Sequence, residues 1–325
     1  MKTAIARMKP LLRWFILGAV VFFLVQVLKT HWQGVTAIRI TAAGWATLAI
    51  ALGVTLLAHI CAGWVWAGML QRDFQQPVQT ATLIPAYLQT NIAKYLPGNI
   101  WHYYGRVTAA TQAGATLETA AVSVALEPLL MAASALLVGL LSGQAIATRY
   151  GAGTWGVFGG GLVITLLVIH PKFLNPVMQR LAQTKLAKAR AQADTPAPPL
   201  HPSRLQHYPA IALLGNLLFL ILRGIGFLFA FQAILAVDWA QVPILLSGFS
   251  VAWLLGLIVP GAPGGLGIFE ATAIALLGHL YPAAALLAVV ACYRLVSVGA
   301  EALGAGLSWV EQRLLLGNLT RSRRE

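Results

Sequence analysis

Long runs of apolar residues constrain this chain more than any other feature. A helix of about 20 apolar residues spans the ~30 Å hydrocarbon core of a bilayer. Hydrophobic residues make up 58% of the 325 residues and charged residues only 10%, a composition that cannot cover a soluble surface. Lipid offers no partner to backbone polar groups, so we expect helices. The uninterrupted runs cover 12–28, 42–70, 120–142, 154–170, 209–236 and 283–309.

Two further apolar segments, 80–111 and 243–281, are each interrupted by a Pro-Gly pair. Proline cannot continue a helix and glycine permits a sharp reversal, so each segment should form a broken or re-entrant helical hairpin. The halves 1–170 and 209–310 then share one order: a long span, a broken segment, and a span that bears an ionisable residue. In opposite orientations they predict an inverted repeat, with the broken segments meeting near the bilayer midplane.

The predicted fold class is therefore an all-α polytopic membrane protein of about 6–8 transmembrane helices, forming one integral membrane domain over 1–325. A polar loop, 171–208, separates the two halves. The start of this loop combines an apolar helical face with basic residues, which indicates either a basic helix on the inner leaflet or a solvated linker. A second basic segment covers 311–325. The run 12–28 has no small-residue cleavage site after it, so we interpret it as an uncleaved anchor.

Basic residues are distributed unevenly across this topology. With the N-terminus in the cytoplasm and each broken segment returning to the side it entered from, 15 of the 22 Lys and Arg residues are cytoplasmic. Only Lys29, Arg39 and Arg149 lie on the outer side. Cytoplasmic loops of membrane proteins carry such an excess, which explains the net charge of +13 without nucleic acid. We expect a multi-pass protein of the inner (plasma) membrane with both termini cytoplasmic.

The first break carries residues expected of an anion site. Asn99 can cap the second short helix, whose free amides and positive dipole end favour a negatively charged group. Lys94 and Arg106 add positive charge on either side of the turn, and a phosphate would suit this arrangement. The alternative is a proline-kinked span whose cations reach out to lipid headgroups. The segment reads Lys94-Tyr95-Leu96-Pro97-Gly98-Asn99-Ile100-Trp101.

The second break is richer in glycine. It is neither a Walker loop nor a dinucleotide fingerprint, but its glycines expose backbone amides and carbonyls that are tolerated at membrane depth only where protein or water satisfies them. A plain helical hairpin is the alternative. Glu270 begins the following helix, where a carboxylate suits the dipole. The segment reads Val259-Pro260-Gly261-Ala262-Pro263-Gly264-Gly265-Leu266-Gly267-Ile268-Phe269-Glu270.

Four ionisable residues lie within uninterrupted spans: Glu127, Arg223, Arg294 and Glu301. Burying one unpaired charge costs at least about 2.5 kcal/mol on insertion scales, so four imply pairing or a wet cavity. Arg294 and Glu301 are two helical turns apart, which favours pairs across the bundle, with Glu127, Arg223 or Glu270 as partners. Structural salt bridges between spans are the equal alternative to a functional role.

The two motifs also carry a family resemblance. The segment 94–101 with Arg106, the run 263–267 followed by Glu270, and the pair Tyr293-Arg294 resemble the lysylphosphatidylglycerol synthase transmembrane-region family, a flippase-like membrane domain. The resemblance covers most of the chain and implies a domain associated with moving lipids between leaflets. Members occur fused to an aminoacyltransferase domain or alone, and we expect a stand-alone member because only sixteen residues follow Trp309. Lysyl transfer is therefore not expected.

These observations favour a translocase of a lipid or lipid-linked intermediate that binds an anionic headgroup while the tails stay in the bilayer. The alternative is an integral-membrane enzyme or accessory subunit acting on a polyprenyl-phosphate or glycolipid. An enzyme would place its polar cluster at one membrane face, whereas charges within the spans favour translocation between pseudo-symmetric halves. A small-solute channel is disfavoured because no amphipathic pore-lining stripe is present. We expect no catalytic residues, metal, cofactor or nucleic acid; the expected partners are the bilayer and an anionic lipid or lipid-linked phosphate.

We predict that Lys94, Arg106, Arg294 and Glu270 line one polar cavity. The full set of candidate substrate-binding residues is Lys94, Tyr95, Pro97, Gly98, Asn99, Trp101, Arg106, Glu127, Arg223, Pro260, Gly261, Gly264, Gly265, Gly267, Glu270, Arg294 and Glu301.

Overall fold

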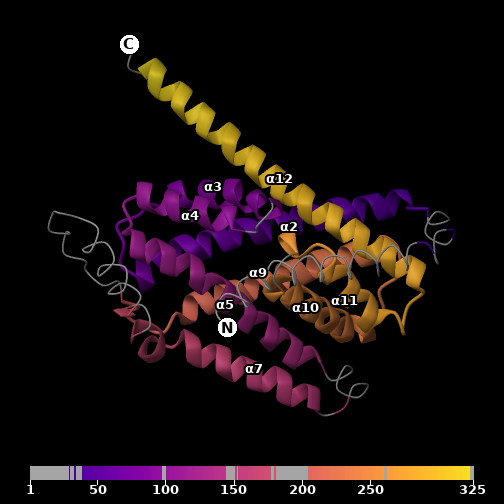
Figure 1. Ribbon diagram of the computed structural model, residues 1–325. Coiled ribbons are helices and arrows are strands. Elements are labelled where there is room, and N and C mark those ends of the chain that lie inside the picture. The colour runs from indigo at the N-terminus through magenta and orange to yellow at the C-terminus, as the bar shows by residue number, and fades with distance from the viewer. Residues whose placement is uncertain are drawn as a thin grey trace, which may run out of the picture.

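A computed structural model gives the arrangement of the chain as a bundle of helices (Figure 1). The apolar run 12–28, both Pro-Gly pairs, Asn99 and most of 171–208 lie outside the described residues. Within the described residues all regular structure is helical, which confirms the all-α class. The structure describes residues 29, 33, 39–96, 100–143, 151, 153–176, 179–180, 204–259 and 262–322.

Five of the described helical stretches are long and apolar enough to cross a membrane, which confirms a polytopic membrane protein. A sixth apolar helix, α7 (Gly153–Ile169), has 17 residues and matches the predicted run 154–170. The five stretches are Ala42–Asp73, Leu117–Ser142, Ala210–Gln232, Trp239–Ile258 and Ala283–Leu314.

In the described residues, the first half of the bundle consists of two long helices, a hairpin of short helices between them, and α7 after them. The short helices have 12 residues each, about 18 Å at 1.5 Å per residue, which is too short for a ~30 Å core. They enter and leave at the same end of the bundle, so the broken segment 80–111 forms a re-entrant hairpin (Figure 1). The elements are α2 (Ala42–Gly68), η1 (Met69–Asp73), α3 (Thr80–Asn91), η2 (Ile92–Tyr95), α4 (Trp101–Gln112) and α5 (Leu117–Ser142).

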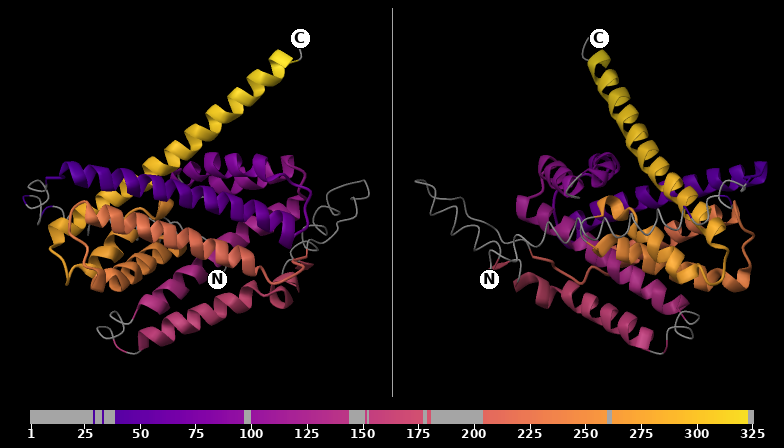
Figure 2. Two further views of the ribbon diagram at one scale, coloured as in Figure 1. Left: turned by 180° about the vertical axis from the view of Figure 1, so that it is seen from behind. Right: turned by 45° about the vertical axis from the view of Figure 1, so that its right-hand side comes forward.

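The second half repeats this order from the opposite end of the bundle. The helices of its hairpin have 17 and 10 residues, and the hairpin enters from the end where the first hairpin does not (Figures 1 and 2). The segment 243–281 thus returns to the end of the bundle from which it starts, and the two halves are inverted relative to each other. The elements are α9 (Ala210–Gln232), η3 (Trp239–Gln241), α10 (Val242–Ile258), η4 (Pro263–Gly265), α11 (Ile268–Leu277) and α12 (Ala283–Ser322).

Hydrogen bonds between loops define the two ends of the bundle. At one end the amide of Gln206 donates to the carbonyl of Asp73 at 3.3 Å, so the chain before α9 lies beside the end of α2. At the other end the hydroxyl of Tyr281, before α12, donates to Gln241, before α10, at 2.5 Å. The two hairpins therefore start from loops at opposite ends.

Capping residues explain where two of the long helices begin. The hydroxyl of Thr41 accepts a hydrogen bond from the Gly44 amide at 3.1 Å, and Thr116 accepts one from Thr119 at 3.3 Å. A hydroxyl in this position satisfies an amide that has no partner within the helix.

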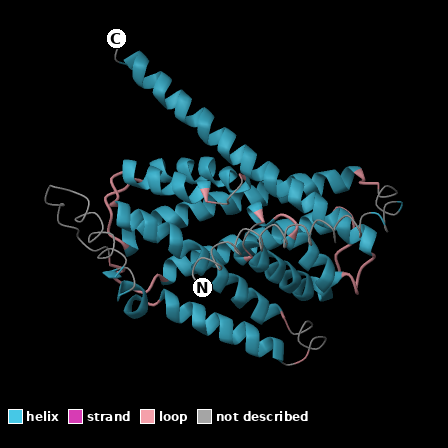
Figure 3. Cartoon of the chain, in the orientation of Figure 1, coloured by secondary structure: helices cyan, strands magenta, loops and turns pink. Residues whose placement is uncertain are grey.

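The final helix differs from its expected bounds. The apolar run predicted a span over 283–309, but α12 is a single helix of 40 residues that ends at Ser322. Its C-terminal part projects well beyond the rest of the bundle (Figures 2 and 3). The end of the apolar run marks the edge of the membrane's hydrocarbon core, not the end of the helix. The residues after it continue the helix because none of them is a proline or glycine until Gly317.

The hairpin tips meet inside the bundle. The ring of Tyr95, in η2, lies against Gly264, in η4, so closely that a β-carbon on this glycine would be 2.5 Å from the ring. Pro97-Gly98 and Pro260-Gly261 lie outside the described residues, but the residues beside them are in contact. This contact places the candidate site between the two halves.

Candidate functional site

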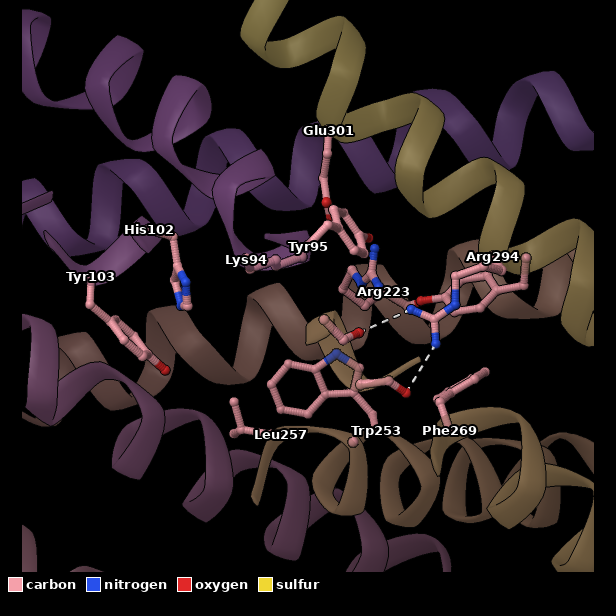
Figure 4. Close-up of a pocket in the computed structure, with 14 residues that line it drawn as sticks. Lys94, Tyr95, His102, Tyr103, Arg223, Trp253, Leu257, Phe269, Arg294 and Glu301 are labelled. Carbon is pink, nitrogen blue, oxygen red and sulfur yellow. Dashed lines mark hydrogen bonds and ion pairs between the residues drawn. The ribbon is translucent and has the colours of Figure 1, made fainter. Parts of the chain in front are cut away.

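A cavity of about 120 Å3 lies beside the two hairpin tips, between them and helices α9, α10 and α12 (Figure 4). A second cavity of about 100 Å3 adjoins it. Six residues line both cavities: Lys94, His102, Tyr103, Arg223, Trp253 and Leu257. The other residues of the first cavity are Tyr95, Gly256, Gly264, Gly265, Phe269, Tyr293, Arg294 and Glu301.

Lys94 joins the first hairpin to α12. Its ammonium donates to Oε1 of Glu301 at 2.5 Å, and the carboxylate of Glu301 is fully buried. Nε2 of His59, on α2, lies 3.3 Å from the same oxygen. One carboxylate thus holds together three elements that are distant in sequence, and it gives a charged partner to a lysine at the tip of a re-entrant hairpin.

The protonation of His59 follows from its neighbours. Oδ1 of Asn91 accepts a hydrogen bond from Nη2 of Arg106 at 3.2 Å, so the amide nitrogen of Asn91 faces Nδ1 of His59, 3.4 Å away. With the amide in this orientation Nδ1 accepts the hydrogen bond and the proton of a neutral imidazole is on Nε2, which faces Oε1 of Glu301. Nη1 of Arg223 lies 3.4 Å from the same Nε2. His59 therefore links the Glu301 and Arg106 clusters without adding a charge.

Arg106 and Glu127 form a buried ion pair between α4 and α5. The hydroxyl of Tyr87, on α3, donates to Oε1 of the same carboxylate at 2.6 Å. The guanidinium of Arg106 also lies over the Tyr87 ring, 3.7 Å from its centroid. These contacts satisfy both charges and fix the two short helices of the first hairpin on α5.

Arg294 holds the tip of the second hairpin. Its Nε donates to Oε1 of Glu270 at 2.6 Å, and its two terminal nitrogens donate to the carbonyls of Gly264 and Gly265 at 3.1 and 3.3 Å (Figure 4). The other oxygen of Glu270 accepts from the amide of Gly267 at 2.6 Å. The planar fork of arginine suits such convergent acceptors, so this cation is fully engaged by the hairpin.

The backbone of this tip requires glycine. Gly264, Gly265 and Gly267 have φ values of +59°, +69° and +83°, which side chains with a β-carbon adopt only with strain. The glycine-rich sequence is thus explained by a left-handed turn whose carbonyls point to Arg294.

Arg223 differs from the other three cations. It lies on α9 and is 6% exposed, yet among the described residues no carboxylate lies within 4.0 Å of it. Its Nη1 lies 3.4 Å from Nε2 of His59, and its guanidinium carbon lies 5.2 Å from the centroid of the Tyr293 ring. Its Nε has no hydrogen-bond partner, which is also true of Nε in Arg106. Four cations and three carboxylates therefore meet in this part of the described chain, and the positive charge in excess lines both cavities.

The structure distributes the candidate residues over several places. Gly267 and Glu270 belong to neither lining, and Trp101 lies half exposed on the outside of α4. Pro97, Gly98, Asn99, Pro260 and Gly261 lie outside the described residues. The candidates in the first cavity are Lys94, Tyr95, Arg223, Gly264, Gly265, Arg294 and Glu301, and those in the second alone are Arg106 and Glu127.

The expectation that Lys94, Arg106, Arg294 and Glu270 line one cavity needs correction. Lys94 and Arg294 do line the first cavity, but Arg106 is bound to Glu127 and reaches only the second. Glu270 faces the backbone of its own hairpin and Arg294 instead. The expectation of pairs across the bundle holds for Arg294, which pairs with Glu270 as expected. Glu301 also has a partner from another element, but it is Lys94, which is not among the expected partners.

Sequence reasoning missed several residues of the site. His59 and Asn91 connect the charged clusters, while His102, Tyr103 and Trp253 line both cavities. The one sequence signal for these residues is a polar residue within an apolar helix, as at His59. Such a residue does not reveal which other residue it contacts.

Comparison with known proteins adds to this geometry. No curated protein sequence matches the chain significantly. The profile of a family described as the lysylphosphatidylglycerol synthase TM region matches residues 11–304, which include both hairpins and all the charged residues of the site. The match extends over most of the 325 residues. The chain therefore belongs to the lysylphosphatidylglycerol synthase TM region family.

Proposed function

We propose that this protein binds the anionic headgroup of a lipid, or of a lipid-linked phosphate, between its two hairpins and moves it from one leaflet to the other. Arg223 is the observation that carries the proposal. A buried guanidinium without a carboxylate partner is costly in a membrane protein, and an incoming phosphate or phosphodiester would supply the missing negative charge. The cavity beside Arg223 gives the headgroup a place.

The position of Arg223 supports translocation rather than simple binding. It lies beside the contact between two hairpins that enter from opposite ends of the bundle. Transporters built from inverted repeats place their substrate sites between such broken helices, and rocking of one repeat against the other opens the site to each side. The flippase-like activity associated with this family agrees with that arrangement.

We further propose that the protein lies in the inner membrane with the 171–208 loop and both termini in the cytoplasm. Lys172 and Arg204 line one surface depression at the end of the bundle where α2 finishes, and Arg72 belongs to the last turn there. On the opposite side the described residues include Lys29 and Arg39, before α2, and Asp238, before α10. This asymmetry follows the positive-inside rule.

Reconstituted vesicles test the proposed activity. Movement of a fluorescent short-chain phosphatidylglycerol across the bilayer should require the protein, and Arg223→Ala should abolish it while the variant is still extracted as a folded protein. Arg223→Lys keeps the charge and should retain part of the rate. Arg72→Ala is the matched control, because Arg72 lies at the end of α2 outside both cavities, and it should transport at the original rate.

Two outcomes would contradict the proposal. Transport of phosphatidylglycerol by Arg223→Ala at the original rate would separate Arg223 from the substrate. Recovery of chemically altered lipid from the vesicles, detected by mass spectrometry, would instead identify a membrane enzyme.

A further inference from the structure

We propose that Glu301 is a proton-binding site, and that the protein takes up one proton together with each anionic headgroup. This inference rests on the proposed function and adds the coupling ion to it. It starts from an exchange that the geometry allows: Lys94 can pair either with Glu301 or with the headgroup, and the carboxylate takes a proton when the lysine leaves it.

Glu301 has the contacts that such a site requires. Its Oε1 accepts from Lys94 at 2.5 Å and from His59 at 3.3 Å. Its Oε2 is buried and has no hydrogen-bond partner among the described residues, although Glu301 borders the first cavity. Oε2 is therefore the oxygen of this carboxylate that is open to a proton.

Lys94 is able to exchange partners. Its side chain is 21% exposed whereas that of Glu301 is 0% exposed, and Lys94 lines both cavities. Its ammonium carries three donors on a flexible stem and can rotate toward a new acceptor. The other two paired cations cannot exchange so readily, because Arg106 is buried between α4 and α5 and Arg294 is held by three acceptors.

Titratable and charged groups face Glu301 from several packed elements. The α2 helix contributes His59, which is neutral. The η2 turn contributes Tyr95, whose hydroxyl lies near Glu301, and α12 itself contributes Tyr293. The α9 helix contributes Arg223 and the α4 helix His102.

Two further elements contribute no free charge. From α3 the nearest polar group is Asn91, which bonds to His59, and from α11 it is Glu270, which pairs with Arg294. Lys94 is thus the one cation in direct contact with the Glu301 carboxylate among the described residues.

Binding of an anion changes this balance. A phosphodiester placed against Arg223 and Lys94 adds a negative charge near Glu301 and removes its cationic partner. With Arg223 engaged by the phosphodiester, the buried carboxylate keeps only neutral neighbours such as His59 and Tyr95, so it is strongly disfavoured as an ion and becomes protonated instead. The proton comes from water and adds to Oε2, and no covalent bond breaks. The headgroup charge and the proton cancel, so the site has the same net charge empty and loaded.

The consequence is a transport step without movement of net charge. Carrying an isolated anion through the low-dielectric interior has a high free-energy cost in each transport cycle. A protonated carboxylate beside a neutralised headgroup avoids that cost. A pH difference across the membrane would then drive the lipid toward one leaflet. By linkage, the affinity for the anion must rise about tenfold for each pH unit lowered in the range where one proton is taken up.

Binding experiments on the full chain in detergent test the coupling. The probe is dioctanoyl phosphatidylglycerol, whose phosphodiester does not titrate near neutral pH, so that any proton taken up belongs to the protein. We expect tighter binding as the pH falls, with uptake of one proton per lipid measured by an indicator dye in weak buffer. Glu301→Gln should bind the probe with an affinity independent of pH and without proton uptake. Glu118→Gln, in the first turn of α5, is the matched control and should behave as the original protein.

The outcomes separate the inference from the function on which it rests. If the original protein binds the lipid with no pH dependence and no proton uptake, the coupling is refuted while anion binding stands; this measurement needs no variant. If Glu301→Gln keeps the full pH dependence, another group is the proton site and the assignment is wrong. If the original protein binds no anionic lipid at any pH, the proposed function fails instead.

Discussion

The ring of Tyr95 lies against Gly264, and this is the contact through which the two oppositely directed hairpins touch. A β-carbon added to Gly264 would stand 2.5 Å from one ring carbon and 2.8 Å from another. The glycine also has a φ of +59°. The junction between the halves therefore depends on the absence of a side chain at one position.

Gly264→Ala should destabilise the protein for two reasons. The left-handed backbone costs about 1–2 kcal/mol with a β-carbon, and the methyl group overlaps the Tyr95 ring. We expect a lower thermal unfolding midpoint in detergent. Combining it with Tyr95→Ala should restore the part of the loss due to overlap. Gly160→Ala in α7, where a β-carbon meets nothing within 4 Å, is the control. Equal unfolding midpoints for Gly264→Ala and Gly160→Ala would exclude the proposed clash.

The Arg106–Glu127 pair should behave as a structural unit. Removing one partner leaves a buried charge uncompensated, which typically costs about 3–5 kcal/mol, so Arg106→Met and Glu127→Gln should each lower the stability markedly. The double variant should lose much less than the sum of the two, because neither charge remains. Chemical unfolding in detergent measures this, with Arg72→Met as a surface control; additive losses would show that the two side chains act independently.

Arg294→Lys should loosen the second hairpin although it keeps the charge. A lysine ammonium cannot reach Glu270 and both glycine carbonyls in the geometry of the arginine fork. The test uses Ala262→Cys in a protein without Cys61 and Cys292; Ala262 is 2% exposed. This cysteine should react slowly with a thiol reagent when residue 294 is arginine and faster in Arg294→Lys. Arg313→Lys is the control for the same exchange outside the site. Unchanged reactivity of the engineered cysteine would mean that Arg294 does not hold this tip.

Labelling of single cysteines should establish the orientation. Trp239, which is 85% exposed, lies before α10 at the end assigned to the outside, so Trp239→Cys should react with an impermeant reagent on intact cells. Arg313→Cys, on the projecting part of α12, should react only after permeabilisation. The reverse pattern would invert the topology and remove the charge argument for it.

The sequence predicts much of the fold because its signals are local. The apolar run 42–70 matches α2, which ends at Gly68 before the π-helical turn, since hydrophobic length is read along the chain itself. The two hairpins follow from helix breaks within apolar segments. The end of α12 could not be predicted this way, because apolar length marks a membrane boundary and not the last helical residue.

The site was less predictable because its contacts join distant segments. Lys94 and Glu301 are 207 positions apart, so no pattern in either segment identifies the pair. The pair of Arg294 with Glu270 was among the expected options, since charged residues in spans need partners. The excess charge on Arg223 emerges only after the three carboxylates of the site, Glu127, Glu270 and Glu301, have been assigned to partners in space.

The unbroken helix α12 makes the two hairpins mechanically dependent on each other. It carries Arg294, which grips the second tip, and Glu301, which grips the first, about 10 Å further along one rigid rod. If α12 shifts together with one hairpin tip, it also displaces the residue that binds the other tip. While both contacts hold, neither tip can move away from α12 without straining the contact of the other.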